Sequence, residues 1–456
     1  MPSRTIVDVA IVAAAMQRLA EQPSATEVGE VEQLLSHTIG TAVFAAISSV
    51  RSLLLAILML MLGAGFLTTL VSVRLQASGT SALAIGLVAT SYFGGLTVGA
   101  MGAGRLVRRV GHIRAFAAFV SLLSASTLTY AVLEAAPLWA LLRFIDGCCV
   151  AGVYVCLESW LNDRADSETR GSVLAGYMIA LYLGQGLGQQ LLNISDTAPS
   201  IPFVVASILV SLAVLPVALT RMAGPALEQT ASLPIRALYA VSPLGIVGVA
   251  LTGVVLGAFY GLAPVYARES GLGIAETAWF MTAVILGGVA LQWPLGRLSD
   301  RLDRRGVIVA TMAGAAASAF ALFASGPAGS GLLFASLFGG TSFALYPLCV
   351  AHTNDHLTSA QRIGATGGLV LVYSLGAVLG PLLASASMST FGPGGLFLVI
   401  GTLSSGVFGF GLWRQWRGDA VPGERQRAYQ MLPRTTPAVA ALDPLSLAAR
   451  DDVSSK

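Results

Sequence analysis

The sequence predicts an all-α membrane protein with twelve transmembrane helices, arranged as two pseudo-symmetric six-helix halves. Of its 456 residues, 55% are hydrophobic and only 11% are charged, whereas soluble domains carry about 25% charged residues. Twelve apolar runs each approach the roughly 20 residues that cross a hydrocarbon core of about 30 Å. Motifs of the first half also recur in the second at a constant offset of 192 positions.

The apolar runs define the expected elements in order. Backbone N–H and C=O groups in lipid must be satisfied within the segment, so runs of this length predict helices. Strands of a membrane barrel would be half as long and would alternate in polarity. The predicted spans cover residues 52–73, 82–104, 115–134, 137–158, 172–193, 201–220, 243–266, 276–296, 306–325, 329–351, 365–388 and 394–413.

Polar segments separate and flank the two halves. Residues 1–50 are expected to form an N-terminal tail, and 221–242 a linker between the halves at 51–220 and 243–415. The apolar stretch 39–50 is too short to cross alone, so it is expected to extend the first span. The C-terminal tail, 416–456, is polar and rich in Pro and Arg, which predicts disorder.

Arginines predict the sidedness of the chain, because short cytoplasmic loops collect positive charge. With both termini in the cytoplasm, the loops after the even-numbered spans hold thirteen arginines and the opposite loops only two, Arg74 and Arg268. This asymmetry predicts a multi-pass protein of a bacterial-type inner membrane. The thirteen are Arg105, Arg108, Arg109, Arg114, Arg164, Arg170, Arg221, Arg236, Arg297, Arg301, Arg304, Arg305 and Arg362.

The internal repeat is carried by several residue types. The matched pairs are Gly95 and Gly287, Gly147 and Gly339, Tyr154 and Tyr346, Asn162-Asp163 and Asn354-Asp355, Arg170 and Arg362, Gly184 and Gly376, and Gly188 and Gly380. Two such halves are typical of carriers that rock about a site near the bilayer midplane. The glycines favour helices that approach and slide, with static packing as the alternative.

A basic, glycine-led loop belongs to the same repeat: "GRLVRRVGHI" begins at Gly104 and "GRLSDRLDRR" at Gly296. The second copy resembles the loop signature of the major facilitator superfamily, G-x-L-A-D-R-x-G-R-R. The resemblance implies that an acid pairs with an arginine near a helix N-terminus and latches the outward-facing state. The residues expected to form this latch are Gly104, Arg109, Gly111, Gly296, Asp300, Arg301, Arg304 and Arg305.

The first copy of the loop departs from that signature. Arg108 stands where the acid belongs, and His112 and Ile113 replace the paired arginines. The first-half loop is therefore expected to latch more weakly, or to use Asp163 or Asp166 from the next cytoplasmic loop. The alternative for both loops is that their arginines only enforce topology.

Three further stretches resemble a YcaD-like subgroup of bacterial transporters: "CLESWLNDRADSETRGSVLAGYMIALYLGQGLGQQLL", "GAFYGLAPVYARESG" and "QWPLGRLSDR". This resemblance implies an architecture and leaves the cargo open. The fifth span also departs, at Ala175 and Gln189, from the glycine-proline pattern of the superfamily's drug–proton antiporters. That departure weakens an antiporter interpretation without removing it.

Ionisable residues within the spans are the first candidates for a transport site, since they cost about 2.5 to 3.5 kcal/mol to insert. Arg143 and Asp146 in "RFIDG" are three residues apart, on one helix face. Arg143 is expected to be a substrate or proton-pathway charge, and Asp146 its counter-ion and protonatable carboxylate. The alternative is a self-satisfied ion pair. Glu158, nearer the span end, could serve coupling or be a solvated helix end.

Polar and aromatic residues in the spans could complete a site. Tyr154 and Tyr346 stand out because the repeat pairs them, which predicts opposite sides of one central cavity. The alternative is that such rings sit at the membrane interface. The candidates are Tyr154, Tyr182, Gln185, Gln189, Tyr260, Gln292, Trp293, Tyr346 and Tyr373.

Together these patterns predict a secondary transporter of a small solute that uses alternating access and is coupled to protons, not an enzyme. An uncoupled facilitator and a transport-inactive membrane sensor are the alternatives. Arg143 favours an anionic or polar solute unless its partner neutralises it. No metal or cofactor is expected: His352 and His356 lack a third ligand, and no nucleotide loop is present. A monomer without nucleic-acid partners is expected.

Overall fold

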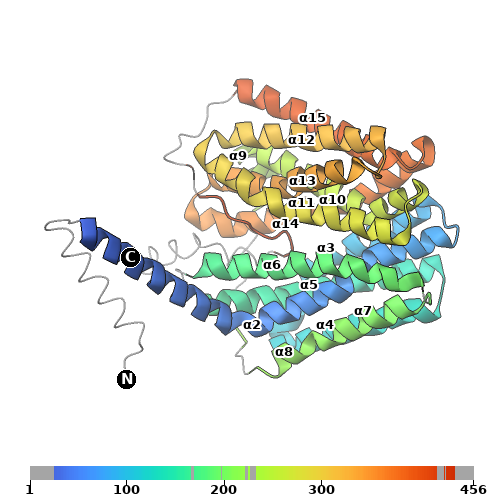
Figure 1. Ribbon diagram of the computed structural model, residues 1–456, viewed down its shortest axis with the longest axis horizontal. Helices are drawn as coiled ribbons and strands as arrows, with labels where there is room; N and C mark the ends of the chain where they lie inside the picture. The colour runs from blue at the N-terminus through green and yellow to red at the C-terminus, as the bar shows by residue number, and fades with distance from the viewer. Residues whose placement is uncertain are drawn as a thin grey trace.

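The computed structural model describes residues 25–165, 169–196, 198–220, 224–225, 233–417, 426 and 428–436 (Figure 1). Side chains are described from residue 47 onward, except those of 195, 196, 359, 360 and 363. The first half contains α2 (Ala25–Ala77), α3 (Ala82–Val110), α4 (His112–Val132), α5 (Ala136–Arg164), α6 (Arg170–Gln189), the 3₁₀ helix η1 (Gln190–Asp196), α7 (Ile201–Leu212) and α8 (Val214–Ala218). After α9 (Ile235–Val241), the second half contains α10 (Pro243–Glu269), α11 (Ile274–Arg301), α12 (Arg304–Ser325), α13 (Gly331–Asn354), α14 (Ser359–Phe391) and α15 (Gly395–Arg417).

Each predicted span coincides with helix, which confirms the all-α architecture. Eleven of the described helical segments are long and apolar enough to cross a membrane, counting α7 and α8 together as Ile201–Ala218. The fifth predicted span corresponds to α6 and η1, which carry several glutamines and pack against α2 and α11. Tertiary contacts rather than hydropathy therefore hold α6 in the bundle.

The first described helix is much longer than the first predicted span. α2 runs without interruption through residues 39–50, so this apolar stretch continues the first span as the same helix. Figure 1 shows the beginning of α2 projecting away from the bundle. The part of the predicted N-terminal tail from Ala25 onward is helical.

A single glycine makes the tight turn between α3 and α4. Gly111 ends α3, begins α4 and has φ +88°, a backbone conformation that residues with a Cβ rarely adopt. Its N–H donates to the carbonyl of Val107 and closes the end of α3. The turn keeps the two helices antiparallel neighbours, with the basic residues of the first-half loop at one end of the bundle.

Glycines let helix pairs within each half pack backbone against backbone. A Cβ on Gly95 would overlap the carbonyl of Phe144, and one on Gly147 would overlap the carbonyl of Tyr92, so α3 and α5 touch directly. The repeat equivalents Gly287 and Gly339 do the same for α11 and α13. At these four positions the glycines serve packing inside a half.

The two halves face one another across a central space, and their direct contacts gather toward one end. We call this end, where α2 ends and α3 begins, the distal end. There Ser72 Oγ donates to the carbonyl of Gly261 at 2.9 Å, and Gln190 Nε2 donates to Thr282 Oγ1 at 2.9 Å. A Cβ on Gly86 would overlap Ser385 of α14. The halves are therefore closed against each other at the distal end.

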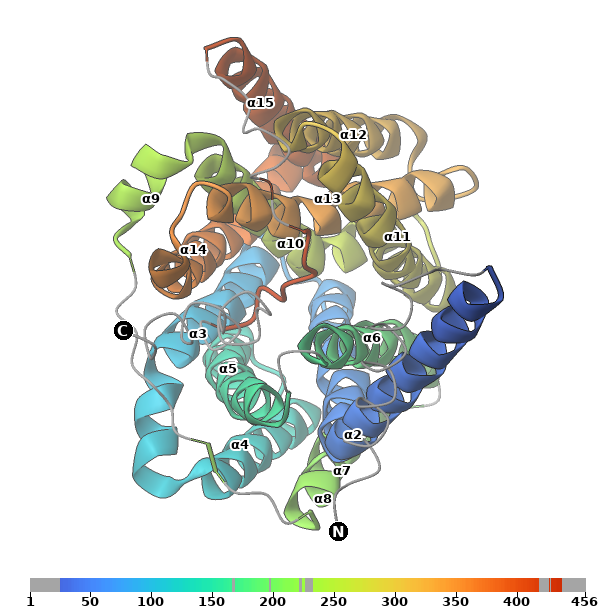
Figure 2. The ribbon, with the colours of Figure 1, turned by 90° about the vertical axis from the view of Figure 1, so that its left-hand side faces the viewer.

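The opposite end, where α3 ends and α4 begins, holds the basic loops and is called the arginine-rich end. Figure 2 looks onto this end and shows the C-terminal segment 428–436 crossing between α13 and α14 of one half and α3 and α6 of the other. The prediction of disorder is wrong for this segment. Polar partners inside the bundle hold it, a stabilisation that its polar composition does not reveal.

Candidate functional site

A cavity of about 130 Å³ lies between the halves, large enough for several water molecules. Helices α2, α3, α5 and α6 of the first half line it, together with α10 and α14 of the second. Pro433, Arg434 and Thr435 of the C-terminal segment close it toward the arginine-rich end. The cavity is therefore shared by three parts of the chain that lie far apart in sequence.

The predicted intramembrane pair forms on α5 beside this cavity. Arg143 Nη1 lies 3.5 Å from Asp146 Oδ2, and both side chains are almost fully buried. Arg143 also donates to Thr68 Oγ1 at 2.6 Å and lies 4.1 Å from the ring centre of Tyr92, both of which line the cavity. The guanidinium is thus neutralised and held at the cavity wall rather than free to bind an anion.

Asp146 is held from its other side by α4. The hydroxyl of Tyr130 donates to Asp146 Oδ2 at 2.7 Å, and both residues are fully buried. A buried carboxylate with a cation and a donor close by is stabilised far better than an isolated one. Asp146 Oδ2 thus receives both contacts, whereas Oδ1 is buried without a hydrogen-bond partner among the described residues. The ion pair forms beside a cavity that a solute or water could reach.

Glu158, one turn beyond Tyr154 on α5, is fully buried and is not a solvated helix end. The hydroxyl of Tyr177 on α6 donates to its Oε1 at 3.1 Å. The hydroxyls of Thr435 and Thr436 donate to its two carboxylate oxygens. The C-terminal segment thus supplies two of the described partners of this carboxylate.

Three of the five predicted residues that line the cavity, Tyr154, Gln185 and Tyr260, form its polar part. Tyr154 lines it from α5, and its hydroxyl contacts Met61 Sδ at 3.4 Å. The Tyr260 hydroxyl of α10 donates to Gln185 Oε1 of α6 at 3.2 Å, a bond that joins the two halves. These residues form a polar patch on a wall whose remaining lining is largely aromatic and apolar.

Other predicted residues lie around the cavity without lining it. Gln189 is buried within the first half, where it accepts from Thr69 Oγ1 at 2.8 Å. Tyr346 is buried with its ring centre 5.4 Å from that of Tyr373, which does line the cavity. Tyr154 and Tyr346 thus come from opposite halves, with Tyr346 one layer further back.

The remaining polar and aromatic candidates lie on α6 and α11, and they differ in whether they face the cavity. Tyr182 lines the cavity from α6. Gln292 of α11 is buried, whereas its neighbour Trp293 is exposed and stacks on Arg297, with the guanidinium carbon 3.8 Å from the ring centre. Trp293 therefore fits the alternative of a ring at the surface of the bundle rather than a place in the site.

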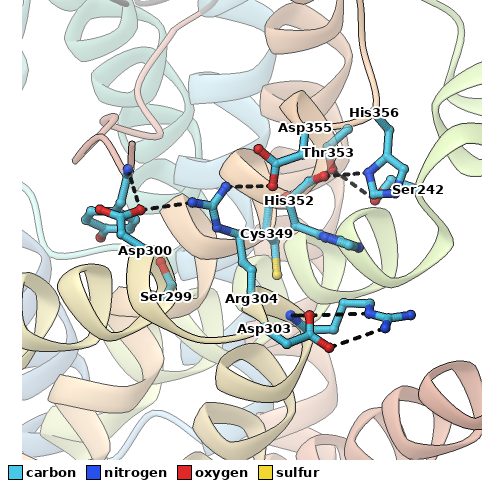
Figure 3. Close-up of polar contacts among 12 residues, drawn as sticks. Ser242, Ser299, Asp300, Asp303, Arg304, Cys349, His352, Thr353, Asp355 and His356 are labelled. Carbon is cyan, nitrogen blue, oxygen red and sulfur yellow. Dashed lines mark hydrogen bonds and ion pairs between the residues drawn. The ribbon is translucent and has the colours of Figure 1, made fainter. Parts of the chain in front are cut away.

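The second-half loop residues form an ion-pair cluster at the arginine-rich end (Figure 3). Arg304 is nearly fully buried and lies between two carboxylates: Nη1 is 2.6 Å from Asp355 Oδ2, and Nη2 is 3.0 Å from Asp300 Oδ1. Asp355 has a side-chain exposure of only 1%, against 34% for Asp300. The buried partner of Arg304 is therefore the acid at the end of α13, which the repeat had matched to Asp163.

The remaining second-half residues of the loop lie nearer the surface. Arg305 pairs with Asp303 at 3.2 Å, and Arg301 is exposed. Gly296 is buried, and a Cβ there would overlap the ring of Tyr429. Its lack of a side chain makes room for the C-terminal segment.

The first-half loop differs from the second at the position that matches Arg304. His112 occupies that position and is buried against Trp160, with ring centres 5.5 Å apart. Among the residues that the structure describes, no cluster of an arginine and two acids forms at this loop. The weaker latching of the first-half loop stays a prediction.

Of the two acids that might have replaced the missing one, only Asp163 lies in the described part of the chain. Asp163, the repeat partner of Asp355, is exposed, and Asp166 lies outside the described residues. Gly104 has open space around most of its backbone and Arg109 is exposed, so these two residues do not join a buried network in this conformation.

Comparisons with known proteins give the family. A model described as Major Facilitator Superfamily matches residues 53–338 and 245–428. The chain belongs to the major facilitator superfamily. It is 30% identical over 359 residues to the uncharacterized MFS-type transporter YcaD of Salmonella enteritidis PT4, covering 78% of this chain and 93% of that protein. A YcaD of Salmonella newport gives the same identity and coverage.

Solved structures of transporters share the fold. The nucleoside transporter NupG has a TM-score of 0.65 at 15% identity and covers 81% of this chain and 99% of its own. A D-xylose-proton symporter has a TM-score of 0.61 at 15% identity, covering 81% and 97%. A bacterial homolog of the human lysosomal transporter Spinster, inward-facing and unoccupied, has a TM-score of 0.60 at 16% identity, covering 90% and 98%. Both predicted resemblances are thereby confirmed.

Several residues at the site of this superfamily member escaped the sequence analysis. Thr68 and Tyr92 hold Arg143, and Tyr130 holds Asp146. Polar or aromatic residues inside predicted spans were the available indication, but sequence spacing cannot connect separate helices. The C-terminal residues gave no indication, because a polar tail beyond the last span is usually outside the bundle.

Proposed function

We propose that the chain is a secondary transporter that moves a small solute by alternating access and couples this movement to protons. The observation that carries the proposal is the position of the cavity. Both halves line it, they are closed at the distal end, and the C-terminal segment fills the space toward the arginine-rich end. This arrangement is the one expected of an inward-facing carrier.

Two buried carboxylates are the candidate coupling groups. Asp146 stands behind the cavity wall with Arg143 and Tyr130, and Glu158 lies at the mouth that the C-terminal segment occupies. One proton crossing 100 mV supplies about 2.3 kcal/mol, enough for roughly fifty-fold accumulation of a solute. In the proposed cycle, Asp146 gains and loses a proton as the cavity faces each side in turn.

The ion-pair cluster of Asp300, Arg304 and Asp355 is formed while the distal end is closed, so we propose that it acts within the second half and not as a latch of the outward-facing state. It ties the beginning of α12 to the ends of α11 and α13, so these three helices move as one body.

With the arginine-rich end in the cytoplasm of a bacterial cell, both termini are cytoplasmic. The monomer contains a complete cavity, so we propose that it is the transporting unit.

The mutual pairing of Arg143 and Asp146 favours one second candidate, an uncoupled facilitator. A carboxylate held permanently by a guanidinium and a phenol would have a packing role and would carry no proton. The two candidates make opposite predictions for Asp146→Asn, which keeps the shape of the side chain and removes its charge.

The test measures internal pH in proteoliposomes while pools of sugars, organic acids, amino acids and amphipathic cations are added outside. We expect one pool to drive a proton flux that Asp146→Asn abolishes while solute counterflow persists. Asp303→Asn, a surface carboxylate paired with Arg305, is the matched control and should leave the flux unchanged. Solute counterflow without any proton flux in the unmodified chain would instead support the facilitator. Uphill accumulation that survives in Asp146→Asn would contradict the coupling role of Asp146, and loss of counterflow as well would indicate a structural defect.

A further inference from the structure

The C-terminal segment 428–436 enters the bundle and is held by named contacts at each of its ends. At its beginning, the Tyr429 N–H donates to Asp300 Oδ1 of α11 at 2.8 Å, and the Tyr429 ring lies over Gly296. At its end, Thr436 is fully buried and donates to Glu158 of α5. The segment therefore bridges the two halves across the arginine-rich end.

Between these ends, Arg434 reaches into a cluster of aromatic rings. Its guanidinium carbon lies 4.8 Å from the ring centre of Phe343 and 5.8 Å from that of Tyr373. Three further rings pack against these two: Tyr182 and Tyr260 have ring centres 5.7 and 6.3 Å from that of Phe343, and the Tyr346 ring centre is 5.4 Å from that of Tyr373. The negative faces of such rings attract a guanidinium, and they do so most strongly where water is excluded. We call these five aromatic residues the aromatic cage.

The charges around the cage also favour a cation. The carboxyl group of Glu158 accepts from Thr435, the residue next to Arg434, so an acidic group stands beside the cage. The basic group on the opposite wall, Arg143, is already paired with Asp146 at 3.5 Å. A solute that carries a positive group and an apolar body therefore fits this surface better than the anionic solute that Arg143 alone suggests.

We propose that the aromatic cage with Glu158 is the binding site for an organic cation with a guanidinium or similar head, and that Arg434 occupies this site as the chain's own competitor. The inference rests on the proposed function, of which it names the substrate class. Because the segment is part of the same chain as the cage, it competes at the high effective concentration of a tethered ligand. A solute must displace it before the halves can close around the cavity.

The test measures equilibrium binding of benzylguanidine, with neutral benzylurea as its uncharged isostere, by calorimetry on the full chain in nanodiscs. Arg434→Gln should bind benzylguanidine about tenfold more tightly than the unmodified chain, since the tethered competitor is weakened. Arg417→Gln is the matched control, because Arg417 stacks on Trp413 at 4.8 Å at the end of α15 and away from the cavity. It should bind as the unmodified chain does.

A second substitution tests whether Glu158 contributes to cation binding, separately from competition by Arg434. The double variant Arg434→Gln with Glu158→Gln should bind benzylguanidine about tenfold more weakly than Arg434→Gln alone. Benzylurea should bind to none of the variants measurably, because it carries no positive charge. If Arg434→Gln binds benzylguanidine no more tightly than the unmodified chain, Arg434 does not compete for the site and the inference is overturned. Equal binding of benzylurea would overturn the cation preference.

Failure of this inference and failure of the proposed function are distinguishable. Binding that follows these expectations while every solute pool stays silent in proteoliposomes would establish the cation site and contradict transport. A solute-driven flux without benzylguanidine binding in Arg434→Gln would leave transport standing and contradict the cation site.

Discussion

The carboxylates that pair with Arg304 and Arg305 are expected to contribute unequally to the free energy of unfolding. Neutralising Asp355, which is buried with Arg304, should cost the most. Three acids of this region each pair with an arginine, but their side-chain exposure differs: 1% for Asp355, 34% for Asp300 and 40% for Asp303. Removing one member of a buried pair costs about 3 to 5 kcal/mol, because the remaining charge stays buried without compensation. Exposed pairs contribute about 0 to 1 kcal/mol.

For Asp355→Asn we expect a loss near the lower limit, about 3 kcal/mol of unfolding free energy, because Asp300 still lies 3.0 Å from Arg304. Asp300→Asn and Asp303→Asn should each lose about 1 kcal/mol or less. In the Asp303→Asn control, the amide oxygen of the new side chain can still accept the N–H of Arg305 at the start of α12, so the helix cap stays intact.

The assay is unfolding in mixed detergent micelles, with the free energy of unfolding compared among the three single variants. A difference of about 2 kcal/mol between Asp355→Asn and Asp303→Asn is roughly a 30-fold difference in the unfolding equilibrium. Equal losses in these two variants would refute the argument that burial, rather than pairing alone, sets the contribution of each carboxylate.

Two further predictions concern the packing of the first half. Gly147→Ala pushes a methyl group into the backbone of α3 and should cost about 1 to 3 kcal/mol, visible as a lower midpoint of thermal unfolding, while Gly102→Ala, with open space around it, should not. Tyr130→Phe removes the donor to the buried Asp146 carboxylate and should cost about 1.5 to 3 kcal/mol in the same measurement. Tyr266→Phe loses only a bond to a neutral carbonyl and should cost about 0.5 to 1.5 kcal/mol; a larger loss than in Tyr130→Phe would contradict the assignment.

Hydropathy and the internal repeat predicted most of the architecture because the bilayer fixes the length of a span. The helical spacing of Arg143 and Asp146 likewise predicted their pairing within α5. Their other partners lie on α2, α3 and α4, and which faces of separate helices meet depends on packing that no sequence spacing encodes. The pair was therefore predictable, but its surroundings were not.

At the arginine-rich end, too, the sequence predicted one contact of the loop motif and missed the others. The resemblance pointed to Asp300 as the acid of the latch, and Asp300 does contact Arg304. The acid with the buried side chain is Asp355, which the repeat had marked as the counterpart of Asp163 without indicating a partner. In the first half His112 stands at the matching position and has no guanidinium to offer, so the repeat itself does not guarantee equal chemistry in both halves.

The C-terminal segment escaped prediction for a different reason. Composition rules ask whether a segment can bury enough apolar surface to offset its ordering entropy. Residues 428–436 are held instead by polar atoms of other elements, such as the carboxylates of Asp300 and Glu158. Such partners become visible only once the helices that carry them are placed together.

The central claim is that the two halves rock as rigid bodies, so that one end opens as the other closes. The most direct measurement is electron–electron distance spectroscopy on two label pairs in the chain freed of its native cysteines: Ala77 with Ser270 at the distal end, and Arg108 with Leu302 at the arginine-rich end. All four positions are exposed.

Gly86→Trp serves as a wedge, because even a Cβ there overlaps Ser385 of the other half. Rocking predicts that the wedge lengthens the distal distance and shortens the distance at the arginine-rich end in the same molecules. A distal distance that lengthens while the other stays fixed would contradict alternating access in this chain.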